Sequence, residues 1–251
     1  MQKAIAIIPA RFASTRFPGK PLVKIEGRTM IMRVYEQAIK AEQLQEVYVA
    51  TDDTRIFDHV NQSGGKAIMT SVNHSSGTER CLEAFQILLK EKKCTPDEII
   101  INIQGDEPFI LPGQIDKLVI AFAQPEVNIA TLIKVLKSPE ELNDPNCVKV
   151  VAGNHGQALY FSRFPIPYVR ENAELEKFVS GLHFKHIGMY AYRSKILAEI
   201  CKLMPSPLEM AEKLEQLRWL EHGYTIHLQV TGHESIAIDS PSDLLKVTNI
   251  S

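Results

Sequence analysis

Short apolar runs alternate with amphipathic stretches along the first hundred residues of the chain. Runs such as Ile5 to Ile8 are apolar at every position and do not alternate with polar residues. This pattern is typical of strands covered by helices on both faces. The alternation predicts βαβ units on a mainly parallel sheet, and therefore a three-layer α/β fold. The predicted strands and helices follow one another over residues 4–8, 30–40, 47–50, 56–62, 78–90 and 99–103.

The second half of the chain has a less regular pattern. A segment near 164–185 contains Pro165, Pro167 and a charged stretch, so it is predicted to be an irregular excursion. Apolar residues at helical spacing predict one helix over 210–222, with Gly223 at its end. Further strands are predicted over residues 129–135, 148–151, 157–161 and 187–192.

Composition limits the class of protein. With 251 residues, 45% of them hydrophobic, the chain can build one substantial core, and we expect a single domain over residues 1–251. A formal net charge of -2 argues against a broad basic surface for nucleic acid or lipid. The first apolar run is too short to span a membrane. The four cysteines are far apart in the sequence, so a reducing cytoplasm is the expected location.

The loop after the first predicted strand is rich in cations. Residues 9–20 contain Arg11, Arg16 and Lys20 together with two hydroxyl side chains, which suits a polyphosphate at the carboxyl edge of a sheet. On charge alone, a solvated basic loop explains the same residues almost as well. The loop has neither the P-loop pattern nor the Gly-x-Gly-x-x-Gly pattern, which disfavours ATPases and dehydrogenases.

Two carboxylates are candidate metal ligands. Asp106 follows the run 99–103, where a cation that bridges phosphate oxygens would lie, and Asp239 follows a later short apolar run. Each has a simpler explanation, because Gly-Asp is common in turns and Asp239 is placed like a helix N-cap. A basic loop on a neighbouring strand favours the metal interpretation for Asp106.

Six sequence motifs follow one another over nearly the whole chain. They are ARFASTRFPGKPL (10–22), HSSGTER (74–80), NIQGDEPFI (102–110), ALYFSRFPIP (158–167), HIGMYAYR (186–193) and LEQLRWLEHG (214–223). In this order, the motifs resemble the 3-deoxy-manno-octulosonate cytidylyltransferase family, the CMP-Kdo synthetases of lipopolysaccharide assembly. The resemblance implies a Rossmann-like fold of the nucleotide-diphospho-sugar transferase type.

The resemblance implies roles for residues at both ends of a nucleotide. It places Lys20, Asp106 and Asp239 in catalysis, with the two aspartates as Mg²⁺ ligands. One departure from the family concerns the approach to Asp239, which is glycine-rich in many members and here reads HESIAID over 233–239. The residues implied for the CTP phosphates are Arg11, Ser14, Arg16 and Lys20, and those implied for cytosine and ribose are Ser76 and Arg80. For Ser76, helix N-capping is a second explanation that does not exclude the first.

The resemblance also implies a set of residues for the eight-carbon sugar acid Kdo. Without it, His186 would be interpreted as a core histidine, Tyr190 as a packed strand residue and Glu215 as a solvated helix position. His183 and His186 are spaced like metal ligands, but no third partner is apparent near them, which disfavours zinc. The implied sugar residues are Gln104, Arg163, His186, Tyr190, Glu215 and Gln216.

The implied reaction is attack of the Kdo C2 hydroxyl on the α-phosphorus of CTP, with pyrophosphate leaving. Such a transfer depends mainly on alignment and charge neutralisation. The family also implies a homodimer. Other sequence-level hypotheses are a cytidylyltransferase for 8-amino-Kdo or a sialic acid, and a catalytically silent nucleotide-binding protein. A glycosyltransferase of similar fold would more typically carry Asp-x-Asp, which Gln104-Gly105-Asp106 is not.

Overall fold

The computed structural model describes residues 4–13, 17–170, 181–233, 238, 240–241 and 243–244. The chain comprises two compact units, each described by itself below. Unit 1 contains residues 1–120, 191–201 and 235–251, and unit 2 contains residues 121–190 and 202–234.

Unit 1 is built on a parallel sheet with strand order β6-β1-β4-β5. Its strands are almost entirely apolar and buried, as the continuous runs predicted. The chain passes from β1 to β4 to β5 and then returns to β6 on the other side of β1. The strands are β1 (Ala4–Ala10), β4 (Leu44–Thr51), β5 (Ala67–Met69) and β6 (Ile99–Asn102), with a separate pair β2 (Lys24–Ile25) and β3 (Arg28–Thr29).

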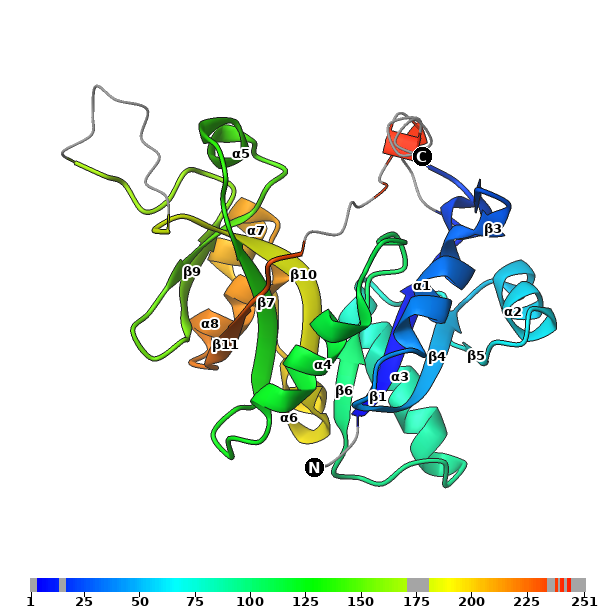
Figure 1. Ribbon diagram of the computed structural model, residues 1–251. Helices are drawn as coiled ribbons and strands as arrows, with labels where there is room; N and C mark the ends of the chain where they lie inside the picture. Colours follow the sequence, from blue (N-terminus) through cyan, green and yellow to red (C-terminus); the bar gives the residue numbers. More distant parts are fainter. Residues whose placement is uncertain are drawn as a thin grey trace. The chain divides into compact units, whose positions relative to one another are not determined.

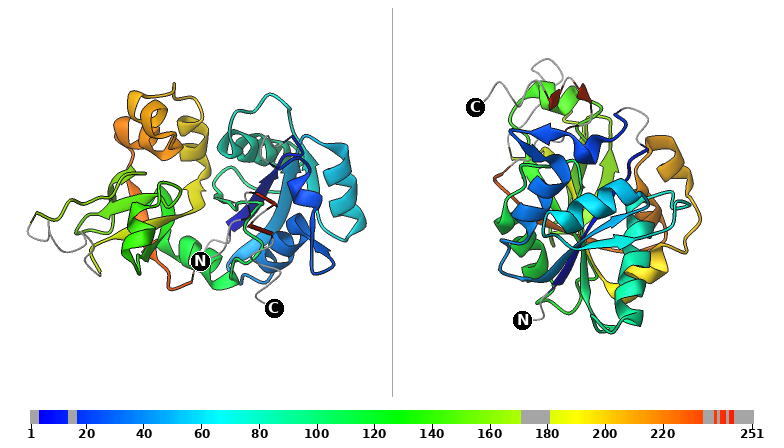
Figure 2. Two further views of the ribbon diagram at one scale, coloured as in Figure 1. Left: turned by 90° about the horizontal axis from the view of Figure 1, so that it is seen from above. Right: turned by 90° about the vertical axis from the view of Figure 1, so that its right-hand side faces the viewer.

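Helices cover both faces of the unit 1 sheet. Because parallel crossovers are right-handed, α1 and α2 lie on one face, and α3, which follows the reversal of direction, lies on the other (Figures 1 and 2). The reversal places a topological switch point between β1 and β6, which is where open α/β sheets bind ligands. The helices are η1 (Lys20–Leu22), α1 (Met30–Ala38), α2 (Thr54–Gln62), α3 (Gly77–Lys90), α4 (Pro112–Ala121) and α6 (Ser194–Ile200).

Unit 2 combines parallel and antiparallel strands. Strand β7 pairs with β11 in parallel, and β8 pairs with β10 and β9 in the antiparallel sense. The last three residues of β10 belong to unit 1. The elements are β7 (Ile129–Val135), α5 (Pro139–Asn143), β8 (Lys149–Ala152), β9 (Ala158–Ser162), β10 (Phe184–Arg193), α7 (Pro207–Glu212), α8 (Glu215–Glu221) and β11 (Ile226–Val230).

The prediction of one helix over 210–222 is wrong, because the segment forms two helices. Helix α7 begins earlier, at a capping box made by Ser206 and Glu209, and the chain breaks at Lys213, whose φ is 55°. Leu214 after the break is extended and buried, and α8 starts behind it. The helix end is as predicted, since α8 stops at Glu221 and Gly223 has a φ of 82°.

The predicted α/β fold is confirmed, and so are the ten predicted strands and helices outside this region, each within a few residues. In the predicted excursion, residues 164–170 and 181–183 have neither helix nor strand, and β10 begins at Phe184. Strand β5, the hairpin β2–β3 and helices α5 and α6 were not predicted, because short elements carry too few periods of the hydrophobic pattern. Helix α4 was not predicted either, because its apolar residues are not confined to one face.

Candidate active site

An ion pair joins the loops that follow β1 and β6. Lys20 Nζ lies 2.7 Å from Asp106 Oδ2, and the two side chains are 13% and 28% exposed. Lys20 opens helix η1 directly after Gly19, whose φ of 72° lets the chain turn inward at this point. Two residues predicted from separate motifs therefore meet at the switch point of the sheet.

The loop with Asp106 depends on a glycine and on a late segment of the chain. A Cβ on Gly105 would lie 2.9 Å from the carbonyl oxygen of Pro9, so only glycine allows the loop to pack against the end of β1. The backbone N–H of Ile238 donates to the Asp106 carbonyl oxygen at 2.9 Å. Ile238 is buried against Ile25 and Met30, which fixes this contact. Asp239 follows Ile238 in sequence but lies outside the described residues, as do Ser14 and Arg16.

Two guanidinium groups lie beside the ends of β1, β4 and β5. Arg80 on α3 is fully buried, donating to Asp52 Oδ2 at 2.7 Å and to Thr70 Oγ1 at 2.6 Å. Arg11 has a buried Nη2 with no hydrogen-bond partner among the residues described. Burial, together with the nearby charge of Arg80, lowers the pKa of Arg11. A buried donor without a partner beside a second cation is suited to an anionic ligand.

The start of α3 is held in a fixed conformation. Ser76 is the N-cap, and its hydroxyl accepts from the Glu79 N–H at 3.2 Å. Ser75 donates to the Glu79 carboxylate from both its backbone N–H and its hydroxyl. Burial alone raises the pKa of Glu79, but these hydrogen bonds outweigh it and leave the pKa below its usual value. A Cβ on Gly77 would lie 3.1 Å from Pro9 Cγ, so the helix start packs closely on β1.

Including Arg11, six of the sequence-predicted residues thus lie at the carboxyl edge of the unit 1 sheet. Lys20 and Asp106 are in contact, Gln104 lies in the same loop as Asp106, and Ser76 caps the helix that carries Arg80. Arg80 differs from expectation in one respect: its guanidinium contacts protein side chains rather than the surface. Sequence reasoning missed Asp52, although its place directly after the second predicted strand was a usable signal.

In unit 2, His186 and Tyr190 belong to a row of aromatic rings. The centroids of Phe161 and His186, of His186 and Tyr190, and of Tyr190 and Trp219 are separated by 5.2, 5.2 and 5.1 Å. Burial raises the pKa of Tyr190 well above its usual value, and Glu215 adds to this effect. Glu215 and the buried Gln216 both lie in the first turn of α8. The four rings therefore form one packed row, and the charge of Glu215 acts on Tyr190 within it.

His186 is held neutral by its surroundings. Its Nε2 lies 2.9 Å from Thr131 Oγ1, and that hydroxyl donates its single proton to the Met189 carbonyl at 2.8 Å. The imidazole Nε2 therefore carries a proton and donates to Thr131. Burial lowers the pKa of His186 to about 3. The imidazole is therefore uncharged at neutral pH.

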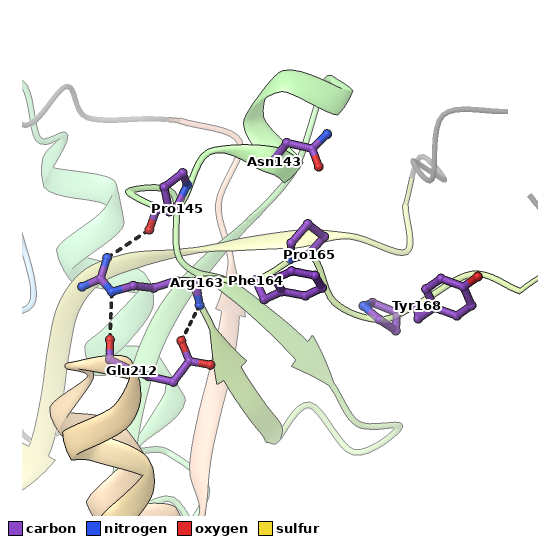
Figure 3. Close-up of a pocket in the computed structure, with 8 residues that line it drawn as sticks. Asn143, Pro145, Arg163, Phe164, Pro165, Tyr168 and Glu212 are labelled. Atoms are coloured by element: carbon purple, nitrogen blue, oxygen red, sulfur yellow. Dashed lines mark hydrogen bonds between the residues drawn. The ribbon is translucent and has the colours of Figure 1, made fainter. Parts of the chain in front are cut away.

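Arg163 forms its hydrogen bonds with residues outside this aromatic row. Its Nε donates to the Glu212 carbonyl at 2.8 Å, and its Nη1 donates to the Pro145 carbonyl at 3.0 Å (Figure 3). Glu212 also accepts from the Ser162 hydroxyl and the Arg163 backbone N–H. A cavity of about 490 Å³ lies here. It is lined by Asn143, Pro145, Arg163, Phe164, Pro165, Pro167, Tyr168 and Glu212.

Within the described ranges, no three His, Cys, Asp or Glu side chains are grouped as metal ligands. His183 Nε2 donates to the Pro167 carbonyl oxygen at 3.1 Å. Over the same part of the chain, no helix combines the length and apolar character needed to cross a bilayer.

Comparison with known proteins gives consistent matches over the chain. The model of a family described as Cytidylyltransferase matches residues 5–228. The 3-deoxy-manno-octulosonate cytidylyltransferase of Cytophaga hutchinsonii is 54% identical over 98% of this chain and 97% of its own length. The enzyme of that name from Parabacteroides distasonis is 50% identical over 98% and 97%. A solved structure of CMP:2-keto-3-deoxy-manno-octonic acid synthetase complexed with CTP is 41% identical, with a TM-score of 0.89 over 99% of this chain and 98% of that one.

Proposed function

Because the chain belongs to the cytidylyltransferase family, and within it to the 3-deoxy-manno-octulosonate cytidylyltransferases, we propose that it transfers CMP from CTP to Kdo and releases pyrophosphate. The product, CMP-Kdo, serves lipopolysaccharide biosynthesis. The observation that carries the proposal is the pairing of Lys20 with Asp106 at the switch point between β1 and β6. A solved relative, 41% identical, was determined with CTP, which supports CTP as the nucleotide.

Unit 1 supplies the groups for the triphosphate. Lys20 and the buried Nη2 of Arg11 are donors of the kind that neutralise phosphate oxygens, and they follow the same strand. Ser14 has the same proposed role on the resemblance alone. Because phosphoryl-type transfer depends mainly on alignment and charge neutralisation, these fixed cations would contribute more than any general base.

Asp106 and Asp239 are the proposed ligands of Mg²⁺. Asp106 fits this role, because it offers a partly exposed carboxylate at the carboxyl edge of the sheet, and Mg²⁺ typically binds one or two carboxylates, water and substrate phosphates. When bound, Mg²⁺ would supply neutralisation of phosphate charge and a lower pKa for the attacking hydroxyl. Lys20, already paired with Asp106, would hold that carboxylate in position.

For the sugar acid we propose the residues that the family resemblance implies. Neutral His186 and Tyr190 offer hydrogen-bonding groups suited to hydroxyls, and Arg163 offers a cation for a carboxylate. Gln104, Glu215 and Gln216 complete the proposed set, on the family resemblance. If Arg163 binds the substrate, it must share or exchange its contacts with the Glu212 and Pro145 carbonyls.

The experiment for the proposed function is pyrophosphate release from CTP with three acids: Kdo, 8-amino-Kdo and a sialic acid. We expect the highest kcat/KM with Kdo, and a requirement for Mg²⁺ that EDTA reveals. Preference for either of the other acids would change the assigned substrate while leaving the nucleotide half intact. Absence of turnover with all three would contradict the proposal and favour a silent nucleotide-binding protein.

We also propose a homodimer located in the cytoplasm. Phe164 and Tyr168 are large, mostly exposed apolar residues at the rim of the unit 2 cavity, and covering them with a second copy would remove that surface from water. The cytoplasmic location is proposed from the four cysteines, which lie far apart in the sequence, as suits a reducing compartment. Light scattering on the purified protein tests the dimer: a mass near twice 28.2 kDa is expected, and a mass of one chain would contradict it.

A further inference from the structure

The buried pair of Arg80 and Asp52 organises one end of the unit 1 sheet. Asp52 follows β4, Thr70 follows β5, and Arg80 on α3 hydrogen bonds to both side chains. The backbone N–H of Thr70 also donates to the Thr51 carbonyl at 2.9 Å. With Arg80 fully buried and Asp52 17% exposed, the carboxylate is the member of this pair that reaches the surface.

Asp52 and the nearby Arg11 each have one hydrogen-bonding atom that is not used within the part of the protein that the structure describes. Asp52 uses Oδ2 for Arg80, and its Oδ1 has no hydrogen-bond partner in the part of the chain that the structure describes. Arg11 has its buried Nη2, likewise without a partner there. Arg11 lies close enough to Asp52 and Arg80 for their charges to shift its pKa, so an acceptor and a donor are available in the same region.

The position of Asp52 along the sheet indicates which part of a nucleotide it meets. Neighbouring strands lie about 5 Å apart, so the loop after β4 is about 10 Å along the edge from the loop after β6, where Asp106 lies. On the side of β1 away from β6, the described edge of unit 1 continues to β4 and β5. A nucleotide with its phosphates at Lys20 and Asp106 would extend its nucleoside in that direction. A carboxylate repels phosphate, but it accepts hydrogen bonds from amino and hydroxyl groups.

We propose that Asp52 is a specificity-determining residue that accepts a hydrogen bond from the nucleoside half of the substrate, while Arg80 holds its carboxylate in place. This inference rests on the proposed function. The donor is either the exocyclic amino group of the base or a ribose hydroxyl. In the first case, the carboxylate selects cytosine over uracil, because uracil presents a carbonyl oxygen where cytosine presents an amino group.

The test compares four nucleotides, CTP, UTP, 2′-deoxy-CTP and 3′-deoxy-CTP, at saturating Kdo and Mg²⁺. Asp52→Asn should lower kcat/KM for CTP by about 10- to 100-fold, mainly through KM, because one charge-assisted hydrogen bond is lost. The substitution should affect the analogue that lacks the donor far less. If Asp52→Asn discriminates less between CTP and UTP than wild type does, the donor to Asp52 is the amino group of the base. If it discriminates less between CTP and one of the deoxynucleotides, the donor is the hydroxyl that this deoxynucleotide lacks.

Two other variants separate direct recognition from a purely structural role. Thr70→Val removes a partner of Arg80 without altering Asp52, so it should change kcat/KM for all four nucleotides by a similar factor. Asp52→Glu keeps the charge beside Arg80 and should fold, yet it displaces the carboxylate and should raise KM for CTP. Thermal unfolding of each variant reports on folding.

The inference would be overturned if Asp52→Asn lowered kcat/KM for all four nucleotides equally. It would also be overturned if Asp52→Asn and Asp52→Glu both left KM for CTP unchanged, or if Thr70→Val altered discrimination between nucleotides as much as Asp52→Asn. These results are distinguishable from a failure of the proposed function itself. In that case, the wild-type protein would show no turnover of CTP with Kdo at all.

Discussion

Single charged residues at the carboxyl edge of the unit 1 sheet contribute little to the stability of the fold. The Lys20–Asp106 pair is partly exposed, and such pairs typically contribute about 0–1 kcal/mol to stability. Arg11 has an unsatisfied buried donor, which costs stability in the absence of a ligand. The placement of these residues is therefore better explained by a bound anion than by folding.

Replacing Lys20 should separate activity from stability. Lys20→Met is expected to lower kcat/KM for CTP by at least about 100-fold, because a fixed cation for the phosphates is lost, while the free energy of unfolding changes by less than about 1 kcal/mol. The control is Lys66→Met, which removes the exposed pair between Lys66 and Glu46 in the same unit and should leave kcat/KM unchanged. Steady-state kinetics and urea unfolding provide both quantities, and an active Lys20→Met protein would exclude the assigned role.

His186 should make the protein less stable in acid. Its pKa is lowered to about 3 in the folded state, against a usual value near 6.5, so the unfolded state binds the extra proton first. The contribution of neutral His186 to the free energy of unfolding is fully present above pH 6.5 and is lost as the pH falls from 6.5 towards 3. The free energy of unfolding changes by at most about 1.4 kcal/mol per pH unit on this account.

His186→Gln should therefore flatten the decline of unfolding free energy between pH 7 and pH 4. His155→Gln, a change of an exposed histidine in the same unit, is the control and should follow the wild-type curve. Urea midpoints at several pH values provide the measurement. Parallel curves for wild type and His186→Gln would show that His186 is not held neutral in the folded protein.

At the scale of elements, long patterns were predictable and short ones were not. The strands of unit 1 carry uninterrupted apolar runs, and α1 to α3 carry several turns of helical periodicity, so their positions follow from the sequence. Strand β5 has three residues, and helix α7 has no buried residue, so neither carries a pattern that can be recognised. In the site, Lys20 and Asp106 were predictable from their places after strands. The Arg80–Asp52–Thr70 group was not, because side chains from three elements meet only in the fold.

The break between α7 and α8 gives a prediction at this scale. Lys213 has a φ of 55°, a left-handed conformation that residues with a Cβ adopt at a cost. Lys213→Gly should raise the free energy of unfolding by about 0.5–1 kcal/mol, because the strain is removed. Lys213→Ala keeps the Cβ and should give no such gain. Equal stability of the two variants in urea would contradict the assigned strain.

For the whole molecule, a small net negative charge coexists with a local cationic site. The formal charge of -2 gives no general attraction for anions, so recognition of a triphosphate depends on the few cations placed at one edge of the unit 1 sheet. The order of strands, β6-β1-β4-β5, places these cations at the switch point. The topology thus brings loops that are far apart in the sequence to one edge of the sheet.

The most direct test of the central claim is the formation of CMP-Kdo from CTP and Kdo by wild-type and Asp106→Asn proteins, over a range of Mg²⁺ concentrations. Asp58→Asn, which changes an exposed carboxylate on α2, is the matched control. We expect wild type and Asp58→Asn to form CMP-Kdo with the same Mg²⁺ dependence, and Asp106→Asn to lose at least about 100-fold in kcat. Near-normal, Mg²⁺-dependent turnover by Asp106→Asn would contradict the account.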